Sequence, residues 1–390
     1  MSDEPKTPDG PQQASGADIQ QIGAVLAPLL EALQVLEEIS RRLHPPALQA
    51  LVEAAAPTGE ALKSAVAAAP DWPDHLAPLG RQMDAAAENA TAAFAGLREA
   101  AGSENATLLA YKALRHLPRA LEAMYPLAGL LAPVSRHFLE PDQRADNALQ
   151  ERLSGVAPEG TGVLAFGPDV DSRETFWAYV PETYDPATAH PLVVALHGGS
   201  GKGRTFLYSW LRTARSRGAI LIAPTSLGGT WALQGDDIDS PHLARIVDFA
   251  RERWTIDERR MLMTGMSDGG TFTYVSGLLA GSPFTHLAPF SAAFHPMLGM
   301  FAEAARVREL PVHVVHGGLD WMFPADMARM AHEWLQQAGA RVTYREIPDL
   351  SHTYAADLNG EILDWVDATA GSRSSDKDPE IHVDDRPGKD

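Results

Sequence analysis

The hexapeptide Gly265-Met266-Ser267-Asp268-Gly269-Gly270 follows the apolar run 261–264 and precedes a helical stretch. A strand-to-helix turn this tight forces its central residue into strained backbone geometry and raises the hydroxyl of Ser267 above the sheet. The flanking glycines are needed because side chains there would collide with the neighbouring strand and helix. The pentapeptide G-x-S-x-G alone arises by accident in roughly one chain in ten of this size. A plain glycine-rich turn with Ser267 as helix cap is therefore the alternative, and the residues around the turn decide between the two.

Short β-rich runs alternate with helical stretches on both sides of this turn. We expect strands at 163–166, 175–180, 192–196, 220–223, 261–264, 288–294, 312–316 and 342–347. We expect helices between them at 205–217, 241–254, 269–279, 325–338 and 359–368. Near-continuous apolar strands are typical of a parallel sheet covered on both faces. The sequence thus predicts an α/β domain over residues 155–370, with a mostly parallel twisted sheet flanked by helices and ligands bound at the carboxyl ends of its strands.

A serine nucleophile needs a general base, and that base needs an orienting carboxylate. Asp320 follows the strand 312–316 after a glycine turn, and His352 follows the last strand. The order Ser, Asp, His, each just beyond a strand end, predicts a catalytic triad of Ser267, Asp320 and His352. Less suitably placed alternatives remain, namely His316 and His332 as base and Asp326 and Asp349 as acid.

A second glycine turn, His197-Gly198-Gly199-Ser200, closes the strand 192–196. Such a turn can offer a backbone N–H to a developing oxyanion, and the N–H of the residue after the nucleophile can supply another. We assign these two donors to Gly199 and Asp268, with Gly198 as the adjacent alternative to Gly199.

Three more residues follow strands at the same edge and are candidate substrate contacts: Trp231, Trp321 and His295. Aromatic walls suit an acyl or aryl group in a pocket. Ordinary packing is the alternative for each tryptophan, and a structural hydrogen bond is the alternative for His295.

Nucleotide and metal motifs are incomplete. A P-loop would need glycine where Leu196 stands and serine or threonine where Gly203 stands. His332-Glu333 lacks the second histidine of H-E-x-x-H, because residue 336 is glutamine, and the chain has no cysteine. We therefore expect neither a metal nor another cofactor.

Residues 18–150 are rich in alanine and leucine and predict a separate helical region. Apolar residues three and four apart predict one buried helix face, made of Ile19, Ile22, Leu26, Leu29, Leu33, Leu36 and Leu43. A packed bundle is favoured over a coiled coil or a polymer-binding helix, because the pattern is too short for most coiled coils. Pro28 is expected to kink or divide this helix, and residues 57–59 to end another, giving about five helices. Homo-oligomerisation through this region stays open.

The 390 residues include 51 acidic and 32 basic side chains, a formal net charge of −19. A field of that sign disfavours nucleic acid and anionic lipid as partners. The first residues lack the pattern of a secretory signal, and no run approaches the ~18–20 uninterrupted apolar residues of a membrane span. We therefore expect a cytoplasmic protein without a membrane span. Residues 1–17 and the acidic tail 371–390 are expected to be disordered.

Residues 160–370 resemble the α/β-hydrolase superfamily, and most closely its small carboxylesterase, phospholipase and feruloyl-esterase-like branch, which includes polyhydroxybutyrate depolymerases. The residues that carry the resemblance are His197-Gly198-Gly199, the hexapeptide 265–270, Asp320 with Pro324, and Ser351-His352. The resemblance implies an oxyanion turn, nucleophile, acid and base at these positions. About sixteen residues separate Phe294 from Pro311, too few for a helical cap. The site is therefore expected to be open unless the N-terminal helices serve as a lid.

Three functions are compatible with these observations. The first is a carboxylic-ester hydrolase acting on a small or medium acyl or aryl ester. The second is a serine peptidase of the prolyl-oligopeptidase type, which shares the order Ser, Asp, His. The third is a polymer- or granule-binding depolymerase docked by the N-terminal helices.

Overall fold

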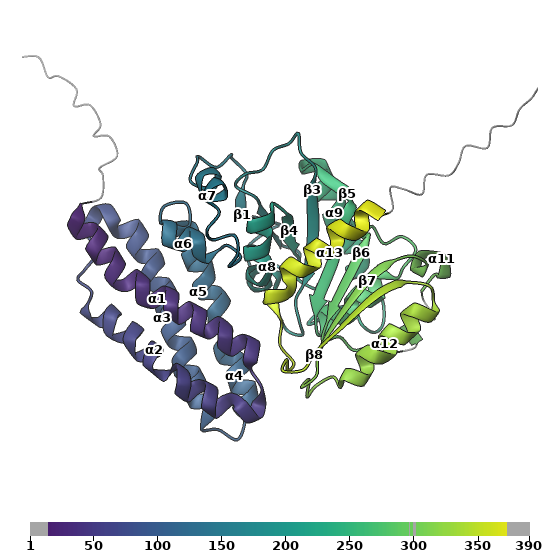
Figure 1. Cartoon of the computed structure of the whole chain (residues 1–390), viewed down its shortest axis with the longest axis horizontal. Helices are drawn as coiled ribbons and strands as arrows, with labels where there is room; N and C mark the ends of the chain where they lie inside the picture. The colour runs from purple at the N-terminus through teal and green to yellow at the C-terminus, as the bar shows by residue number, and fades with distance from the viewer. Residues whose placement is uncertain (1–14, 296, 299–301, 373–390) are drawn as a thin grey trace, which may run out of the picture.

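A helical bundle lies beside an eight-stranded sheet in the computed structural model (Figure 1). The structure describes residues 15–295, 297–298 and 302–372. Most of the predicted lead-in 1–17, and all but two residues of the predicted tail 371–390, lie outside the described residues. At these two borders the helices extend further than expected, because the first begins at Gly16 and the last ends at Ser372.

The N-terminal region contains α1 to α5, followed by two short helices. Their bounds are α1 Gly16–Arg42, α2 Leu48–Ala68, α3 Ala77–Ala101, α4 Ala106–Leu114, α5 His116–Met124, α6 Ala132–His137 and α7 Asn147–Leu153. A capping box starts α1, in which Ser15 and Asp18 each bond the other's backbone N–H. α1 packs on α2, α3 and α5, and α3 packs on α4 and α5.

The predicted helix end at residues 57–59 is wrong, and Pro28 does not divide its helix; a kink at Pro28 stays a prediction. α1 continues through Pro28, and α2 continues through Pro57, where a helix end was expected. A proline removes one hydrogen bond, whereas burial of the helix face on both sides holds the helix together. In α2 this packing is close, because a Cβ on Gly59 would lie 3.0 Å from Cγ of Phe94 in α3.

The predicted apolar stripe of α1 is buried except at its first residue. Ile19 is 64% exposed, and the other members are buried in the bundle core. Among the described residues, α1 alone has the length and composition that would allow a helix to cross a membrane. Here its stripe packs against the neighbouring helices, and the expectation of no membrane span stays a prediction.

The sheet has the order β1-β2-β4-β3-β5-β6-β7-β8, in which β2 runs antiparallel to both of its neighbours, β1 and β4, and every other neighbouring pair is parallel. All eight expected strands are present. Their bounds are β1 Gly162–Phe166, β2 Phe176–Val180, β3 His190–Leu196, β4 Ile220–Ala223, β5 Ile256–Met266, β6 His286–Phe290, β7 Pro311–Gly317 and β8 Arg341–Ile347. This mixed sheet with its flanking helices confirms the predicted α/β class.

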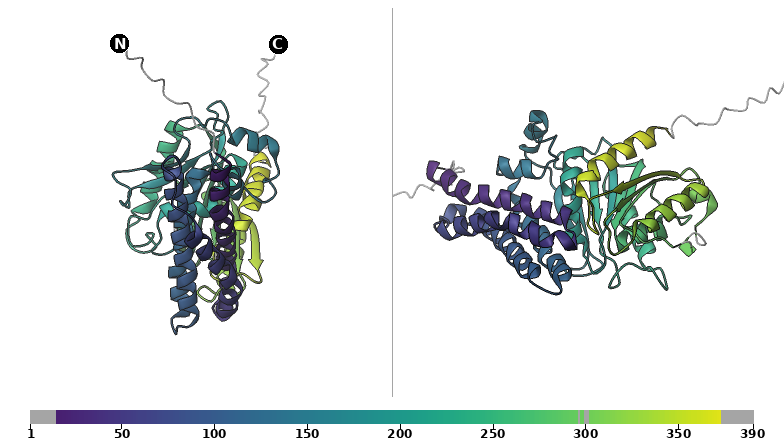
Figure 2. Two further views of the ribbon diagram at one scale, coloured as in Figure 1. Left: turned by 90° about the vertical axis from the view of Figure 1, so that its left-hand side faces the viewer. Right: turned by 60° about the horizontal axis from the view of Figure 1, so that its bottom comes forward.

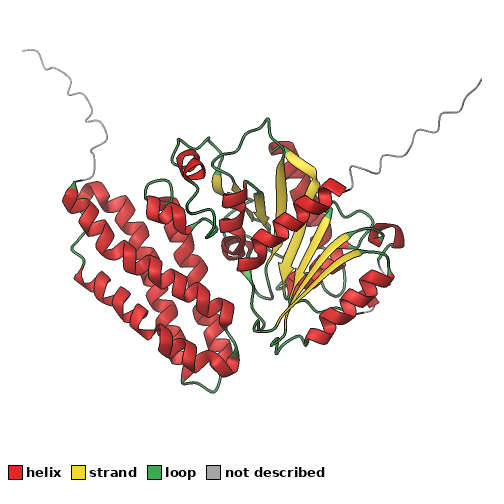
Figure 3. Ribbon diagram, in the orientation of Figure 1, coloured by secondary structure: helices red, strands yellow, loops and turns green. Residues whose placement is uncertain are grey.

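Helices cover both faces of the sheet (Figure 3). Their bounds are α8 Gly203–Arg217, α9 Asp239–Arg253, α10 Asp268–Gly277, α11 Ala304–Val307, α12 Ala325–Gln337 and α13 Asn359–Ser372. Alternate residues of β3 point to opposite faces. Leu192 and Val194 join the core under α9, α10 and α12, whereas Val193 and Ala195 join the core under α8 and α13.

The core under α8 and α13 continues into the bundle, where α5 packs on α8. The bundle is thereby joined to one side of the sheet, as the view from below shows (Figure 2). Between β6 and β7 the described residues include 3₁₀-helical residues at 297–298 and the four-residue helix α11.

Candidate active site

The turn between β5 and α10 holds Ser267 in a strained conformation. Its φ is 56° and its ψ is −117°, in the region that side chains other than glycine rarely occupy. Residue 269, two positions further on, must be glycine, because a Cβ on Gly269 would lie 2.4 Å from the carbonyl oxygen of Leu196. The Ser267 N–H donates to the carbonyl of Phe290 at the end of β6, at 3.0 Å. The nucleophile candidate is thus fixed between two strand ends.

The structure brings Ser267, Asp320 and His352 together. His352 Nε2 lies 3.0 Å from Ser267 Oγ, and His352 Nδ1 lies 2.8 Å from Asp320 Oδ2. The three side chains follow β5, β7 and β8, whose carboxyl ends lie at one edge of the sheet. A carboxylate only accepts hydrogen bonds, so the proton sits on Nδ1 and leaves Nε2 free to accept the serine proton. This is the arrangement that base-assisted attack by a serine requires.

The Asp320 carboxylate is held from its own loop. Its Oδ1 accepts the backbone N–H groups of Met322 at 3.0 Å and Phe323 at 2.8 Å. Burial raises the pKa of Asp320, but the hydrogen bonds from His352 and Phe323 outweigh burial and hold this pKa below its ordinary value. Asp320 is consequently ionised in the folded protein at neutral pH.

The alternative acids and bases lie in other environments. His316 is buried, with its Nε2 donating to the carbonyl of Phe323 at 2.8 Å and lying 3.5 Å from Asp320 Oδ2. It therefore contacts the acid and not the nucleophile. His332 packs on Tyr344, Asp326 pairs with Arg329, and Asp349 is exposed.

The second glycine turn lies against the nucleophile turn. A Cβ on Gly198 would be 3.6 Å from Ser267 Cβ, and one on Gly199 would be 2.8 Å from Asp268 Oδ2. Among the described residues, no hydrogen bond occupies the backbone N–H of Gly199 or of Asp268. Both predicted oxyanion donors are thus beside Ser267 with their N–H groups unused, and Gly198 is equally adjacent.

The ring of His197 supports this turn from below, a role that the sequence analysis missed. Its Nδ1 donates to the carbonyl of Gly198 at 2.7 Å, and its Nε2 accepts the N–H of Ser226 at 3.1 Å. Burial lowers the pKa of His197 to about 4, so the ring stays neutral and can make both bonds at once. The signal available in the sequence was its position directly after β3.

Trp231 is held mainly by packing, the alternative named for it, and its contact with a substrate stays a prediction. It lies at a cavity wall but is only 2% exposed, and its indole N–H donates to the carbonyl of His197 at 2.7 Å. Its ring stacks on Phe272, with centroids 5.3 Å apart. Because its faces are occupied, Trp231 supports the glycine turn and offers no broad surface to a ligand.

The other two candidate substrate contacts differ from each other. Trp321 is 46% exposed, and its ring centroid lies 6.5 Å from that of His352, so it stands at the mouth of the site. His295 is exposed and its Nδ1 accepts the N–H of Met297 at 3.1 Å, the structural bond named as its alternative role. Among the described residues, His295 has no hydrogen bond to the three clustered side chains.

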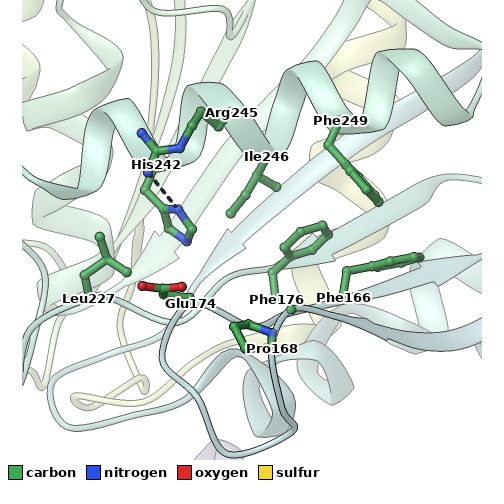
Figure 4. A pocket seen from close by; sticks show the side chains of 10 residues that line it. Phe166, Pro168, Glu174, Phe176, Leu227, His242, Arg245, Ile246 and Phe249 are labelled. Atoms are coloured by element: carbon green, nitrogen blue, oxygen red, sulfur yellow. Dashed lines mark hydrogen bonds between the residues drawn. The ribbon is translucent and has the colours of Figure 1, made fainter.

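Two cavities open near this edge of the sheet. One, of about 610 Å³, reaches Gly199, Thr230 and Asp268 beside the nucleophile turn. There Thr230 Oγ1 donates to Asp268 Oδ2 at 2.5 Å. The other, of about 440 Å³, is lined by aromatic rings and by His242, whose Nδ1 accepts from Arg245 at 3.4 Å (Figure 4). Its lining includes none of the three clustered residues.

Comparison with known proteins places this geometry in context. Residues 237–369 match the phospholipase/carboxylesterase family model. The bifunctional acetylxylan esterase/xylanase XynS20E of Neocallimastix patriciarum is 30% identical over 149 residues, 36% of this chain and 21% of that protein. Dipeptidyl-peptidase 5 of Aspergillus oryzae is 22% identical over 282 residues, 60% of this chain and 38% of that protein. The chain therefore spans less than half the length of these curated relatives.

Solved structures include similar folds. A thermostable esterase aligns with 20% identity and a TM-score of 0.41, over 54% of this chain and 62% of its own. A ferulic acid esterase of Anaeromyces mucronatus aligns with 16% identity and a TM-score of 0.42, over 55% of this chain and 94% of its own. The family match over residues 237–369 and the acetylxylan esterase relative confirm the predicted resemblance to the esterase-like α/β-hydrolases.

Proposed function

We propose that this chain, which belongs to the esterase-like α/β-hydrolases, hydrolyses carboxylic esters with Ser267 as nucleophile, His352 as base and Asp320 as the orienting acid. One observation carries the proposal. The His352 ring bridges the other two side chains, with Nε2 at 3.0 Å from Ser267 Oγ and Nδ1 at 2.8 Å from Asp320 Oδ2. Both distances are within the range of hydrogen bonds.

The reaction proceeds in two halves. In the first, His352 Nε2 takes the proton of Ser267, whose Oγ bonds to the ester carbonyl carbon. The carbonyl oxygen becomes negative and accepts hydrogen bonds from the N–H groups of Gly199 and Asp268. When the bond to the leaving oxygen breaks, the protonated His352 gives that oxygen its proton. Asp320 stabilises the histidine cation during this step.

The second half repeats these steps with water. His352 takes a proton from water, the resulting oxygen attacks the acyl carbon, and the bond to Ser267 Oγ breaks. The proton returns from His352 to Ser267 Oγ, and the carboxylic acid leaves. Apart from water and the ester, the groups named in these steps are side chains and backbone N–H groups of the chain itself.

A small or medium acyl or aryl ester is the substrate class that fits best. The exposed ring of Trp321 stands near His352, and exposed Leu319 and Met322 flank the buried Asp320. These apolar groups suit an acyl or aryl substituent at the mouth of the site. The similarity to a protein named as an acetylxylan esterase supports an ester as the bond that is cleaved. The similarity to a protein named as a dipeptidyl-peptidase makes a peptide bond the second candidate.

One experiment separates these candidates. Wild type, Ser267→Ala and the control Ser276→Ala would be assayed on p-nitrophenyl esters from acetate to palmitate and on dipeptide p-nitroanilides. Ser276 is a buried serine further along α10, so its loss tests the effect of removing a hydroxyl there. Ester turnover lost only in Ser267→Ala is the expected result. Turnover of the anilides without the esters would favour the peptidase.

A further inference from the structure

The loop that carries His352 is bonded to the N-terminal bundle by three consecutive residues. Tyr111 in α4 donates its hydroxyl to the backbone carbonyl of His352 at 2.6 Å. His44, just after α1, has its Nδ1 3.4 Å from Ser351 Oγ, and Thr353 Oγ1 donates to the carbonyl of Arg41 at 3.3 Å. Helix α4 therefore bonds the base's own backbone, and the end of α1 and the residue His44 after it bond the side chains on either side of the base.

The Tyr111 bond is the strongest of the three by its length. Burial raises the pKa of the Tyr111 hydroxyl to about 12, so it remains a protonated donor throughout the pH range in which the protein would work. The Trp321 side chain lies near the same hydroxyl and offsets part of the rise in its pKa. Tyr111 thus lies between the backbone of the base and an aromatic ring at the mouth of the site.

The contact with Arg41 uses a group that helix geometry leaves free. The last carbonyls of a helix have no partner within it, and Arg41 lies in the last turn of α1. Its carbonyl accepts from Thr353, and its guanidinium pairs with Asp357 at 3.0 Å. The end of α1 is therefore capped by the segment that follows the base.

The other side of the histidine loop rests on the loop of the acid. Leu319 N–H donates to the carbonyl of Leu350 at 2.9 Å, and Ser351 Oγ donates to the carbonyl of Leu319 at 3.3 Å. The backbone around His352 is consequently held between the Asp320 loop and the bundle. A shift of the bundle relative to the Asp320 loop would therefore move His352 Nε2 relative to Ser267 Oγ.

We propose that the N-terminal helices position the triad base, with Tyr111 as the positioning residue that fixes the backbone of His352. This inference rests on the proposed function, because it takes His352 to be the base. It assigns the helical region a part in setting the base and nucleophile at reacting distance. Misplacement of a catalytic group by about 1 Å can cost as much as a hundredfold in rate.

The test compares Tyr111→Phe with Tyr125→Phe in the full-length chain. Tyr125 is matched because it is half-buried, lies in the same region, and donates its hydroxyl to Glu182 of the sheet domain at 2.8 Å. It has no contact with the histidine loop among the described residues. Both variants lose one bond between bundle and sheet, so both should lower the melting temperature by similar amounts.

The principal readout is the rate at which a fluorophosphonate labels the nucleophile. Ser267 Oγ bonds to phosphorus, fluoride leaves, and His352 takes the serine proton, so this rate reports base and nucleophile for any serine hydrolase. We expect labelling and kcat to fall about tenfold in Tyr111→Phe, with KM within about twofold, because only the placement of reacting groups changes. Tyr125→Phe should label at the wild-type rate.

Thr353→Val gives a second variant of the same loop. It keeps the side-chain shape but cannot donate to Arg41, and we expect a smaller loss of kcat in the same direction. Wild-type labelling and kcat in both Tyr111→Phe and Thr353→Val would overturn the inference. So would an equal loss in Tyr125→Phe, since general destabilisation would then explain the effect.

The outcome also distinguishes this inference from the proposed function. If wild type is labelled at Ser267 but turns over no ester, the ester proposal fails while the comparison of the two tyrosine variants still decides the positioning role. If wild type is not labelled at all, the base and nucleophile are wrongly assigned and both proposals fall.

Discussion

The indole N–H of Trp231 donates to the carbonyl oxygen of His197 at 2.7 Å, which ties a buried tryptophan to the glycine turn beside Ser267. Trp231→Phe keeps the ring stacked on Phe272 but leaves this buried carbonyl without its partner. An unpaired buried acceptor costs about 1–3 kcal/mol. We expect kcat on p-nitrophenyl acetate to fall about tenfold, with the preference for acyl length unchanged. Steady-state kinetics across the ester series would show this.

Trp321 is expected to behave in the opposite way, because it is exposed beside His352. Trp321→Ala should raise KM for the longer acyl chains more than it lowers kcat for acetate. An altered length preference in Trp231→Phe, or an unaltered one in Trp321→Ala, would contradict the roles assigned to the two rings.

Asp320→Asn should abolish most activity without unfolding the protein. An amide in this position no longer selects the Nδ1–H form of His352 or stabilises its cation, and a loss of roughly 10⁴-fold in kcat is expected. Asp326→Asn is the matched control, because Asp326 is exposed and pairs with Arg329 at 2.7 Å. A circular dichroism spectrum and kcat for both variants test the prediction. Comparable activity in the two variants would mean that a residue other than Asp320 is the acid.

Ser267 should limit stability as well as supply the nucleophile. Its φ of 56° and ψ of −117° are strained for any residue with a Cβ and unstrained for glycine. Ser267→Gly and Ser267→Ala both remove the hydroxyl, but only the glycine relieves the strain. The glycine variant should therefore unfold with a free energy about 1 kcal/mol higher than the alanine variant. Urea denaturation of the glycine and alanine variants measures this difference. Equal midpoints for the two variants would mean that the strain is absent.

His313 should make the fold sensitive to acid. It is buried in β7 against Trp365, at 5.2 Å between ring centroids, and neither ring nitrogen has a partner among the described residues. Burial lowers the pKa of His313 from 6.5 to about 4. Between these values the unfolded chain binds a proton that the folded protein does not, so the free energy of unfolding falls as the pH falls through this window.

His313→Phe removes this group while keeping an aromatic ring. At pH 5 the histidine should lower the free energy of unfolding by roughly 2 kcal/mol relative to pH 7. On acidification from pH 7 to pH 5, the urea midpoint of wild type should therefore fall more than the urea midpoint of His313→Phe. A gap between the two midpoints that is the same at both pH values would mean that His313 carries a proton in the folded state.

Features set by local pattern were predictable from the sequence. The strands follow from short apolar runs, and the proximity of Ser267, Asp320 and His352 follows because each comes shortly after one of these runs. Parallel strands end at one edge, so the chain order alone predicts that these side chains gather there.

Features set by packing between distant segments were not predictable. Tyr111 and His352 are 241 residues apart, and nothing near either residue indicates their bond. Helix α2 survives Pro57 because Phe94 packs on its next turn, and Trp231 is buried because it stacks on Phe272 and bonds His197. In each case a tertiary contact determined the local structure, against what the local residue preferences suggested.

The most direct test of the account is to trap the covalent intermediate. Wild type turning over p-nitrophenyl acetate would be quenched in acid within the first turnovers, digested and analysed by mass spectrometry. We expect one acetyl group on the peptide that contains Ser267, absent from Ser267→Ala treated in the same way. Ester turnover with no acetyl group on that peptide, or with the group on another residue, would contradict it.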